Sequence, residues 1–126
     1  MPPGEINALT QKVIGLAIEV HRELGPGLLE ATYEECLAFE LEQAGLPFER
    51  QLPLPVVYKN VRLDLGYRLD IVIEGRLILE LKTVEHIAAV HEAQMLTYLK
   101  LSKIDIGLLM NFNSAVLKDG IRRFRN

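Results

Sequence analysis

Apolar residues recur at steps of three and four in three parts of the chain, which is the spacing of helices with one buried face. The first stretch, 6–24, follows a loose lead over residues 1–5 and ends at a glycine. The second stretch, 29–44, also ends at a glycine, which commonly stops a helix. The third stretch covers 88–101. The pattern therefore predicts two helices near the N-terminus and one in the second half of the chain.

The segments between and after these helices favour strands. Residues 48–58 read as extended but contain two prolines, which restricts them to an edge or an irregular strand. A short strand over 61–65 follows, and 104–112 is almost entirely apolar, as expected for a strand buried on both faces. A last strand is expected over roughly 116–124. This order predicts an α/β (α+β) fold with a mixed central sheet flanked by helices.

The stretch from Tyr67 to Lys82 has the clearest strand pattern, because aliphatic and polar residues alternate on both sides of a turn at Glu74-Gly75. A register that pairs Ile71 with Leu79, and Leu69 with Leu81, places the aliphatic side chains on one side. A two-residue loop would break this match. The pattern therefore predicts a hairpin with an odd-length loop or a bulge.

The same register sets Asp70 opposite Glu80, with Lys82 two residues further on and on the same face. A structural interpretation treats Glu80 and Lys82 as an ion pair on a solvated strand and Asp70 as an ordinary polar residue. A chemical interpretation starts from the repulsion of two close carboxylates, which a hard cation such as magnesium or manganese relieves. A neighbouring lysine can then hold an attacking water and stabilise charge on a phosphate. Spacing alone leaves both interpretations open.

Two further groups of polar residues deserve a place among the candidates. Glu30 falls in the first turn of the second helix, where the helix dipole favours an acid, and it shares a face with Tyr33. In the third helix, His91, Gln94 and Tyr98 fall on one stripe. Such a stripe facing the end of the hairpin would be unusual for a purely structural helix, but spacing is equally compatible with solvent exposure.

Length and charge limit the possible functions. A chain of 126 residues predicts a single domain over 1–126. The formal net charge of −3 counts against tight, non-specific binding of nucleic acid, which usually needs a basic surplus. It leaves room for a metal-dependent enzyme that touches few phosphates. The C-terminal part does carry local positive charge, from Lys118, Arg122, Arg123 and Arg125.

Cysteine usage and hydropathy indicate a compartment. The single cysteine, Cys36, precludes an internal disulfide and fits a reducing environment. No stretch of about 18 apolar residues is present, and the N-terminus has no basic region followed by an apolar run. We therefore expect a soluble, cytoplasmic protein without a membrane span.

The segment Gly27 to Tyr33, Gly-Leu-Leu-Glu-Ala-Thr-Tyr, resembles the signature of the GxxExxY protein family. The resemblance extends over nearly the whole chain, from Ile14 to Ile121. That family is placed in the PD-(D/E)XK nuclease superfamily, which has a restriction-endonuclease-like core. Asp70 matches the motif aspartate, 80–82 matches (D/E)-x-K, and Gln94 with Tyr98 is similar to the helix motif of exonuclease-like branches. The proline that often precedes the aspartate is replaced by leucine.

The resemblance implies a role for each matching residue. Asp70, Glu80 and the carbonyl oxygen of Leu81 would bind Mg²⁺ or Mn²⁺, and Glu30 would reach the metal directly or through water. Lys82 would position the nucleophilic water. The helix motif, Gln94 and Tyr98, would orient Lys82 or the scissile phosphate, while His91 and Tyr33 would be supports rather than catalysts.

Two classes of function follow. The first is a metal-dependent nuclease that hydrolyses phosphodiester bonds of DNA, or less readily RNA, and a domain this small would cut a duplex most simply as a homodimer. The second is a catalytically silent module that keeps the nuclease fold and works through a protein partner or through nucleic-acid binding. The acidic charge and small size motivate the second class, and the complete trio of Asp70, Glu80 and Lys82 favours the first.

Overall fold

The computed structural model describes residues 3–126, so the first two residues of the expected loose lead and of the expected single domain lie outside the described residues. Residues 3–5, which were expected in that lead, belong instead to the first helix. The helices are α1 (Pro3–Leu24), α2 (Glu30–Gln43), α3 (Ala89–Ser102) and the short 3₁₀ helix η1 (Leu117–Gly120). The strands are β1 (Phe48–Pro53), β2 (Val56–Tyr58), β3 (Val61–Leu63), β4 (Arg68–Ile73), β5 (Leu77–Lys82), β6 (Ile106–Asn111) and β7 (Ile121–Arg125).

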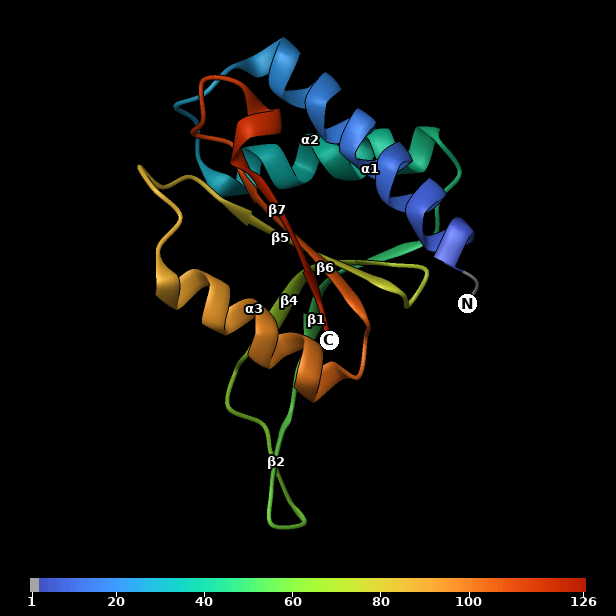
Figure 1. The fold of residues 1–126 in the computed structure, drawn as a ribbon, viewed down its shortest axis with the longest axis vertical. Helices are drawn as coiled ribbons and strands as arrows, with labels where there is room; N and C mark the ends of the chain where they lie inside the picture. The colour runs from blue at the N-terminus through green and yellow to red at the C-terminus, as the bar shows by residue number, and fades with distance from the viewer. Residues whose placement is uncertain (1–2) are drawn as a thin grey trace.

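Five strands form a mixed sheet in the order β1-β4-β5-β6-β7. Only the pair β5–β6 within this sheet is parallel, and α3 makes the crossover between these two strands. Figure 1 shows α1 and α2 layered on one side of the sheet and α3 on the other. The predicted α/β fold with a mixed sheet flanked by helices is thus confirmed.

The two helical layers cover separate hydrophobic clusters. One cluster joins α1 and α2 to the sheet through residues such as Val13, Leu37 and Leu79. The other joins α3 to the opposite face through residues such as Met95 and Ile78. All six residues of β6 are buried, which confirms the expected strand covered on both faces.

The segment expected to be one extended stretch over 48–58 is divided in two. Residues Phe48–Pro53 form the edge strand β1, in agreement with the edge position that Pro53 favours, and Pro55 lies in the connection to β2. Strands β2 and β3 form a separate two-stranded hairpin, which projects away from the sheet at the bottom of Figure 1. Likewise, the strand expected over 116–124 begins as η1 and becomes β7 only at Ile121.

The central hairpin has the predicted register at its closed end. Ile71 pairs with Leu79, and the loop has three residues, Glu74 to Arg76, so the expected odd length is confirmed. Glu74 and Gly75 adopt positive φ angles of 53° and 68°, the left-handed geometry that a tight turn of this kind needs.

The predicted stacking of Leu69 beside Leu81 is wrong. Leu81 packs in the cluster under α1 and α2, whereas Leu69 packs in the cluster under α3. The alternation of β4 therefore breaks between Leu69 and Ile71. On the neighbouring strand β1, Gln51 has a φ of 50° and lies between the residues paired with Ile71 and Leu69. Next to this kink, the side chains at the start of β4 change from one face of the sheet to the other, and a period-two pattern does not reveal such a change.

Tyr33 ties the connection between α1 and α2. Its hydroxyl donates to the carbonyl oxygen of Gly25 at 2.6 Å and accepts from the N–H of Leu28 at 3.1 Å. Its ring is fully buried and stacks on Phe112 with 4.6 Å between centroids. The expectation that Tyr33 is a support is consistent with these contacts.

Candidate active site

Strands β4 and β5 separate beyond the Ile71–Leu79 pair, and two carboxylates bridge the gap. The backbone N–H of Asp70 donates to Oε2 of Glu80 at 2.8 Å. The backbone N–H of Leu81 donates to Oδ2 of Asp70, also at 2.8 Å. Each carboxylate thus takes the place of a backbone carbonyl in the ladder. The predicted juxtaposition of Asp70 and Glu80 is present, in a form that holds both side chains between the strands.

This position makes Glu80 a strongly perturbed acid. Its side chain is buried, with 4% of the residue surface exposed. Burial, and after it the charge of Asp70, raise the pKa of Glu80 to about 8 against the opposing effects of the Asp70 N–H and Lys82. A buried, perturbed carboxylate at the end of a strand is typical of functional sites.

Asp70 is also held between the strands, and several groups oppose the effect of burial on its pKa. Burial raises its pKa, and the hydrogen bond from Leu81 acts in the opposite direction. The charge of Glu34 also raises the pKa of Asp70, while Lys82 and the side chain of Gln51 lower it. Two carboxyl groups that disfavour each other's charge therefore share this gap with one ammonium group.

Glu30 comes to this end of the hairpin from the first turn of α2. Its side chain is exposed, yet nearby protein atoms displace enough water to raise the pKa of its carboxyl. Lys82 and the N–H of Thr83 lower that pKa, and Asp70 and Glu34 raise it. Glu30 thus interacts electrostatically with Lys82 and Asp70, which is compatible with the role that the family resemblance implies for it.

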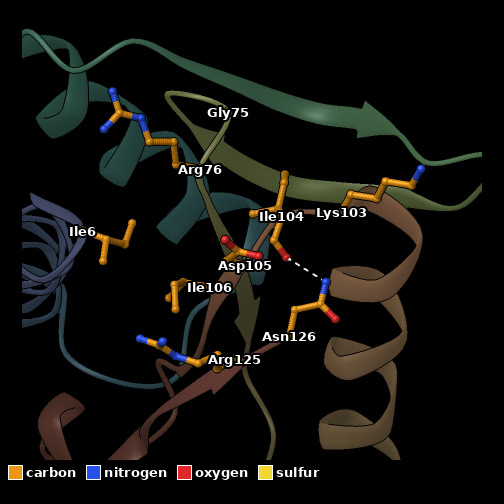
Figure 2. A pocket seen from close by; sticks show the side chains of 9 residues that line it. All are labelled: Ile6, Gly75, Arg76, Lys103, Ile104, Asp105, Ile106, Arg125 and Asn126. Carbon is orange, nitrogen blue, oxygen red and sulfur yellow. Dashed lines mark hydrogen bonds between the residues drawn. The ribbon is translucent and has the colours of Figure 1, made fainter. Parts of the chain in front are cut away.

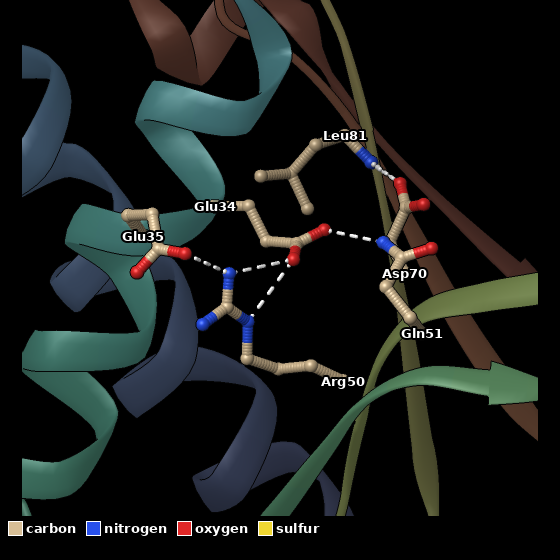
Figure 3. A network of polar contacts seen from close by, with 6 residues as sticks. All are labelled: Glu34, Glu35, Arg50, Gln51, Asp70 and Leu81. Atoms are coloured by element: carbon tan, nitrogen blue, oxygen red, sulfur yellow. Dashed lines mark hydrogen bonds and ion pairs between the residues drawn. The ribbon is translucent and has the colours of Figure 1, made fainter.

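A second acid on α2, Glu34, supports the site through contacts with β1, and sequence reasoning missed it. Glu34 lies one helical turn after Glu30 and is buried. Its Oε2 accepts from Nε and Nη2 of Arg50 at 3.0 and 2.9 Å, and its Oε1 accepts from Nε2 of Gln51 at 2.7 Å. Figure 3 shows this chain of contacts leading from α2 through β1 toward Asp70. The i, i+4 spacing of the two acids was the available signal, because it places both on one helical face.

Gln94 and Tyr98 lie on α3, on the other side of the sheet from α2 (Figure 1). Tyr98 is buried, and burial raises the pKa of its hydroxyl, as do the charges of Glu80 and Asp70. Gln94 is half-buried beside it. His91 accepts a hydrogen bond at Nδ1 from the N–H of Ala88 at 2.9 Å, so it caps the start of α3. Within the predicted helix motif, the charges of Asp70 and Glu80 thus act on Tyr98, which lies on the side of the sheet that α3 covers.

The segment after Lys82 is fastened by Asn111, which pairs with Lys82 in the parallel ladder. Its side-chain Oδ1 accepts from the N–H of Val84 at 3.1 Å, and its Nδ2 donates to the carbonyl oxygen of Val84 at 2.8 Å. This buried amide fixes the course of the chain as it leaves β5. It is a second supporting residue that no pattern in the sequence singled out.

The donor set suits a hard divalent cation in its chemistry. Glu30, Asp70 and Glu80 are oxygen donors, and the charge of Asp70 raises the pKa of both glutamates, a repulsion that a cation would relieve. Within residues 3–126, however, acidic, histidine and cysteine side chains form no group of three already arranged around one point. One or more carboxylates would have to rotate to complete a metal site.

A polar cavity of about 370 Å³ lies at the opposite end of the sheet, beside the β4–β5 turn (Figure 2). Gly75, Asp105 and Arg125 contribute to its walls. The side chains of Arg76 and Lys103 also line it but point in opposite directions in Figure 2. These cations do not converge, and the cavity is separate from the carboxylates.

None of the helices within residues 3–126 is both long enough and apolar enough to cross a membrane.

Comparison with protein families gives one match. A family described as the PD-(D/E)XK nuclease superfamily matches residues 7–124, which is nearly the whole chain. No curated protein and no solved structure matches this chain.

Proposed function

The chain belongs to the PD-(D/E)XK nuclease superfamily, and from this premise we propose that it hydrolyses phosphodiester bonds of DNA in a metal-dependent reaction. The observation that carries the proposal is the pair of carboxylates, Asp70 and Glu80, fixed across the opened end of β4 and β5 beside Lys82. Within the superfamily, the segment Gly27 to Tyr33 (GLLEATY) supports membership of the GxxExxY family, as a further part of the proposal.

Asp70 and Glu80, together with the carbonyl oxygen of Leu81, would hold Mg²⁺ or Mn²⁺, and Glu30 would approach from α2. A bound divalent cation supplies Lewis-acid stabilisation of phosphate oxygens and lowers the pKa of water. The hydrogen bonds from the N–H groups of Leu81 and Asp70 each engage one carboxylate oxygen. These bonds hold both side chains between β4 and β5, from where rotation of a carboxylate would complete the metal site.

Lys82 supplies the positive charge of the site. It ends β5 two residues after Glu80, and its charge lowers the pKa of Glu30, Asp70 and Glu80. In that position it can hold a water by hydrogen bonding and stabilise negative charge that develops on a phosphate. Tyr98 and Gln94, from α3, would orient the phosphate or Lys82.

Site variants test the proposal directly. We expect Asp70→Asn, Glu80→Gln and Lys82→Met each to lower the rate of manganese-dependent cleavage of labelled DNA by roughly 100-fold or more. Glu42→Gln and Lys12→Met, at exposed positions on α2 and α1, serve as matched controls and should cleave like the wild type. Circular dichroism verifies that each variant is folded. Undiminished cleavage by Lys82→Met would reject the proposed chemistry.

A second candidate function rests on the absence of a ready-made metal site among the described residues. The hydrogen bonds of Asp70 and Glu80 also close the gap between β4 and β5, so the carboxylates serve the fold even without a metal. In this alternative the protein is a catalytically silent module that acts through a protein or nucleic-acid partner. Calorimetric titration with Mn²⁺ decides between the two, because a silent module takes up no metal with or without DNA present.

A further inference from the structure

A mostly apolar groove of about 440 Å³ opens beside the candidate active site. One wall is a stripe along α3 that includes Val90, Gln94 and Thr97. The other wall is formed by Val56 of β2 and by Tyr67, the residue before β4. Its size falls within the range of protein pockets that take small aromatic ligands.

Tyr98 links the groove to the carboxylates. It lines the groove and packs in the buried cluster that contains Leu69, the residue before Asp70. The charges of Glu80 and Asp70 also raise the pKa of its hydroxyl. A molecule that occupies both would place an apolar, planar part against α3 and an anionic part near Lys82. A nucleotide has this composition, since its base is flat and its phosphate is charged.

Tyr67 is the exposed aromatic residue of the groove. Its residue surface is 47% exposed, and its ring meets that of Tyr98 edge to face, with 6.5 Å between centroids. The carbonyl oxygen of Tyr67 accepts a hydrogen bond from the N–H of the buried Leu54 at 2.8 Å, which fixes its backbone. An aromatic ring held at the edge of a groove is a suitable surface for stacking a base.

The charge of the molecule also favours stacking over phosphate contacts as the source of affinity. The formal net charge is −3, which disfavours strong non-specific attraction of phosphates. Stacking on an aromatic ring requires a base that is not paired within a duplex. The amide of Gln94 and the hydroxyl of Thr97 are then available polar groups for the edge of such a base.

We propose that the groove between Tyr67 and α3 binds an unpaired nucleobase next to the bond to be cleaved, which makes single-stranded nucleic acid the substrate. This inference rests on the proposed function and names its substrate class.

The test measures binding without cleavage, in the presence of a chelator. Fluorescence anisotropy compares a labelled single strand, an abasic strand of equal length, and a blunt duplex. We expect the single strand to bind most tightly. Tyr67→Ala should weaken its binding roughly tenfold, whereas Tyr67→Phe, which keeps the ring, should bind like the wild type. Tyr58→Ala is the matched control, because Tyr58 is another exposed tyrosine that does not line the groove.

Equal binding of the abasic strand or of the duplex would overturn the inference, as would equal binding by Tyr67→Ala and the wild type. Absence of binding to any strand would overturn it too. Separate cleavage assays with Mn²⁺ distinguish it from the proposed function. Base-dependent binding without cleavage would leave the groove standing and reject hydrolysis. Cleavage with an unchanged KM in Tyr67→Ala would leave hydrolysis standing and reject the groove.

Discussion

At the scale of single residues, Glu80 is a carboxyl group that the fold keeps in a buried position where its charged form is disfavoured. Its pKa is raised from 4.5 to about 8, mainly by burial. Between these two pH values the folded protein keeps a proton that the unfolded chain releases. The unfolded state then binds fewer protons, so the free energy of unfolding falls as the pH rises.

We therefore expect the metal-free protein to unfold at a lower temperature at pH 8 than at pH 5.5. Glu80→Gln, which removes the titrating group, should flatten this dependence and be more stable than the wild type at pH 8, by about 1 kcal/mol or more. Thermal unfolding followed by circular dichroism with a chelator measures both. Glu49→Gln, at an exposed position of β1, is the control and should keep the wild-type slope. An unchanged slope in Glu80→Gln would mean that other groups cause it.

Tyr33 makes a complementary case, in which a residue of a sequence motif has a structural role. Tyr33→Phe keeps the ring that stacks on Phe112 but removes both hydrogen bonds to the α1–α2 connection. We expect the free energy of unfolding to fall by about 1–2 kcal/mol. Urea denaturation measures the change, with Tyr58→Phe on the exposed hairpin as a control. A loss no larger than that of Tyr58→Phe would contradict the role assigned to the hydroxyl.

At the scale of elements, the central hairpin separates what a pattern can predict from what it cannot. Alternating aliphatic residues predicted the Ile71–Leu79 pair and the odd loop, because a buried face fixes the register. The turning over of Leu69 could not be predicted in this way. On the neighbouring strand β1, Gln51 has a positive φ, and within the hairpin itself the side chains of Asp70 and Glu80 replace backbone acceptors; a period-two pattern encodes neither feature.

Prediction of the candidate site from the sequence is limited in the same way. Asp70, Glu80 and Lys82 were predictable because they lie on adjacent strands of one local hairpin. Glu34 and its partner Arg50 were missed, since their pairing requires α2 to pack against β1. Local spacing carries information about neighbours in sequence, whereas the residues that support a site come from every element around it.

The packing of elements against the sheet gives a prediction of its own. Two buried or close-packed glycines differ in what a methyl group would meet. At Gly107 of β6 it would meet Sδ of Met95, the flexible end of a side chain on α3. At Gly120, before β7, it would lie 2.8 Å from the backbone oxygen of Asn111 and close to Ser114.

We therefore expect Gly120→Ala to destabilise the protein more than Gly107→Ala. Overpacking typically costs about 1–3 kcal/mol, and the backbone contact of Gly120 places it at the upper end because a backbone atom yields less than a thioether. Urea denaturation of the two variants measures the order. A larger loss in Gly107→Ala would show that α3 is seated on β6 too tightly for Met95 to move.

At the scale of the whole molecule, the acidic net charge and the acidic site lead to one coupled expectation. The formal net charge is −3, and among the carboxylates of the site the charge of Asp70 raises the pKa of both Glu30 and Glu80. Their mutual repulsion weakens the folded state, and a cation that binds there would add its binding free energy to the stability of the entire domain. Thermal stability thus reports on the site without any assay of cleavage.

We expect Mn²⁺ to raise the unfolding temperature of the wild type, with a gain of about 2.7 kcal/mol when the free metal is 100 times its Kd. The gain should be larger at pH 8 than at pH 6, because the carboxylates must lose protons to bind the metal. Differential scanning calorimetry at both pH values measures it. Glu80→Gln and Asp70→Asn should lose the gain, while the exposed control Glu42→Gln should keep it. An equal gain in all four proteins would place the metal elsewhere on the acidic surface, and the carboxylates between β4 and β5 would then serve only to hold the strands.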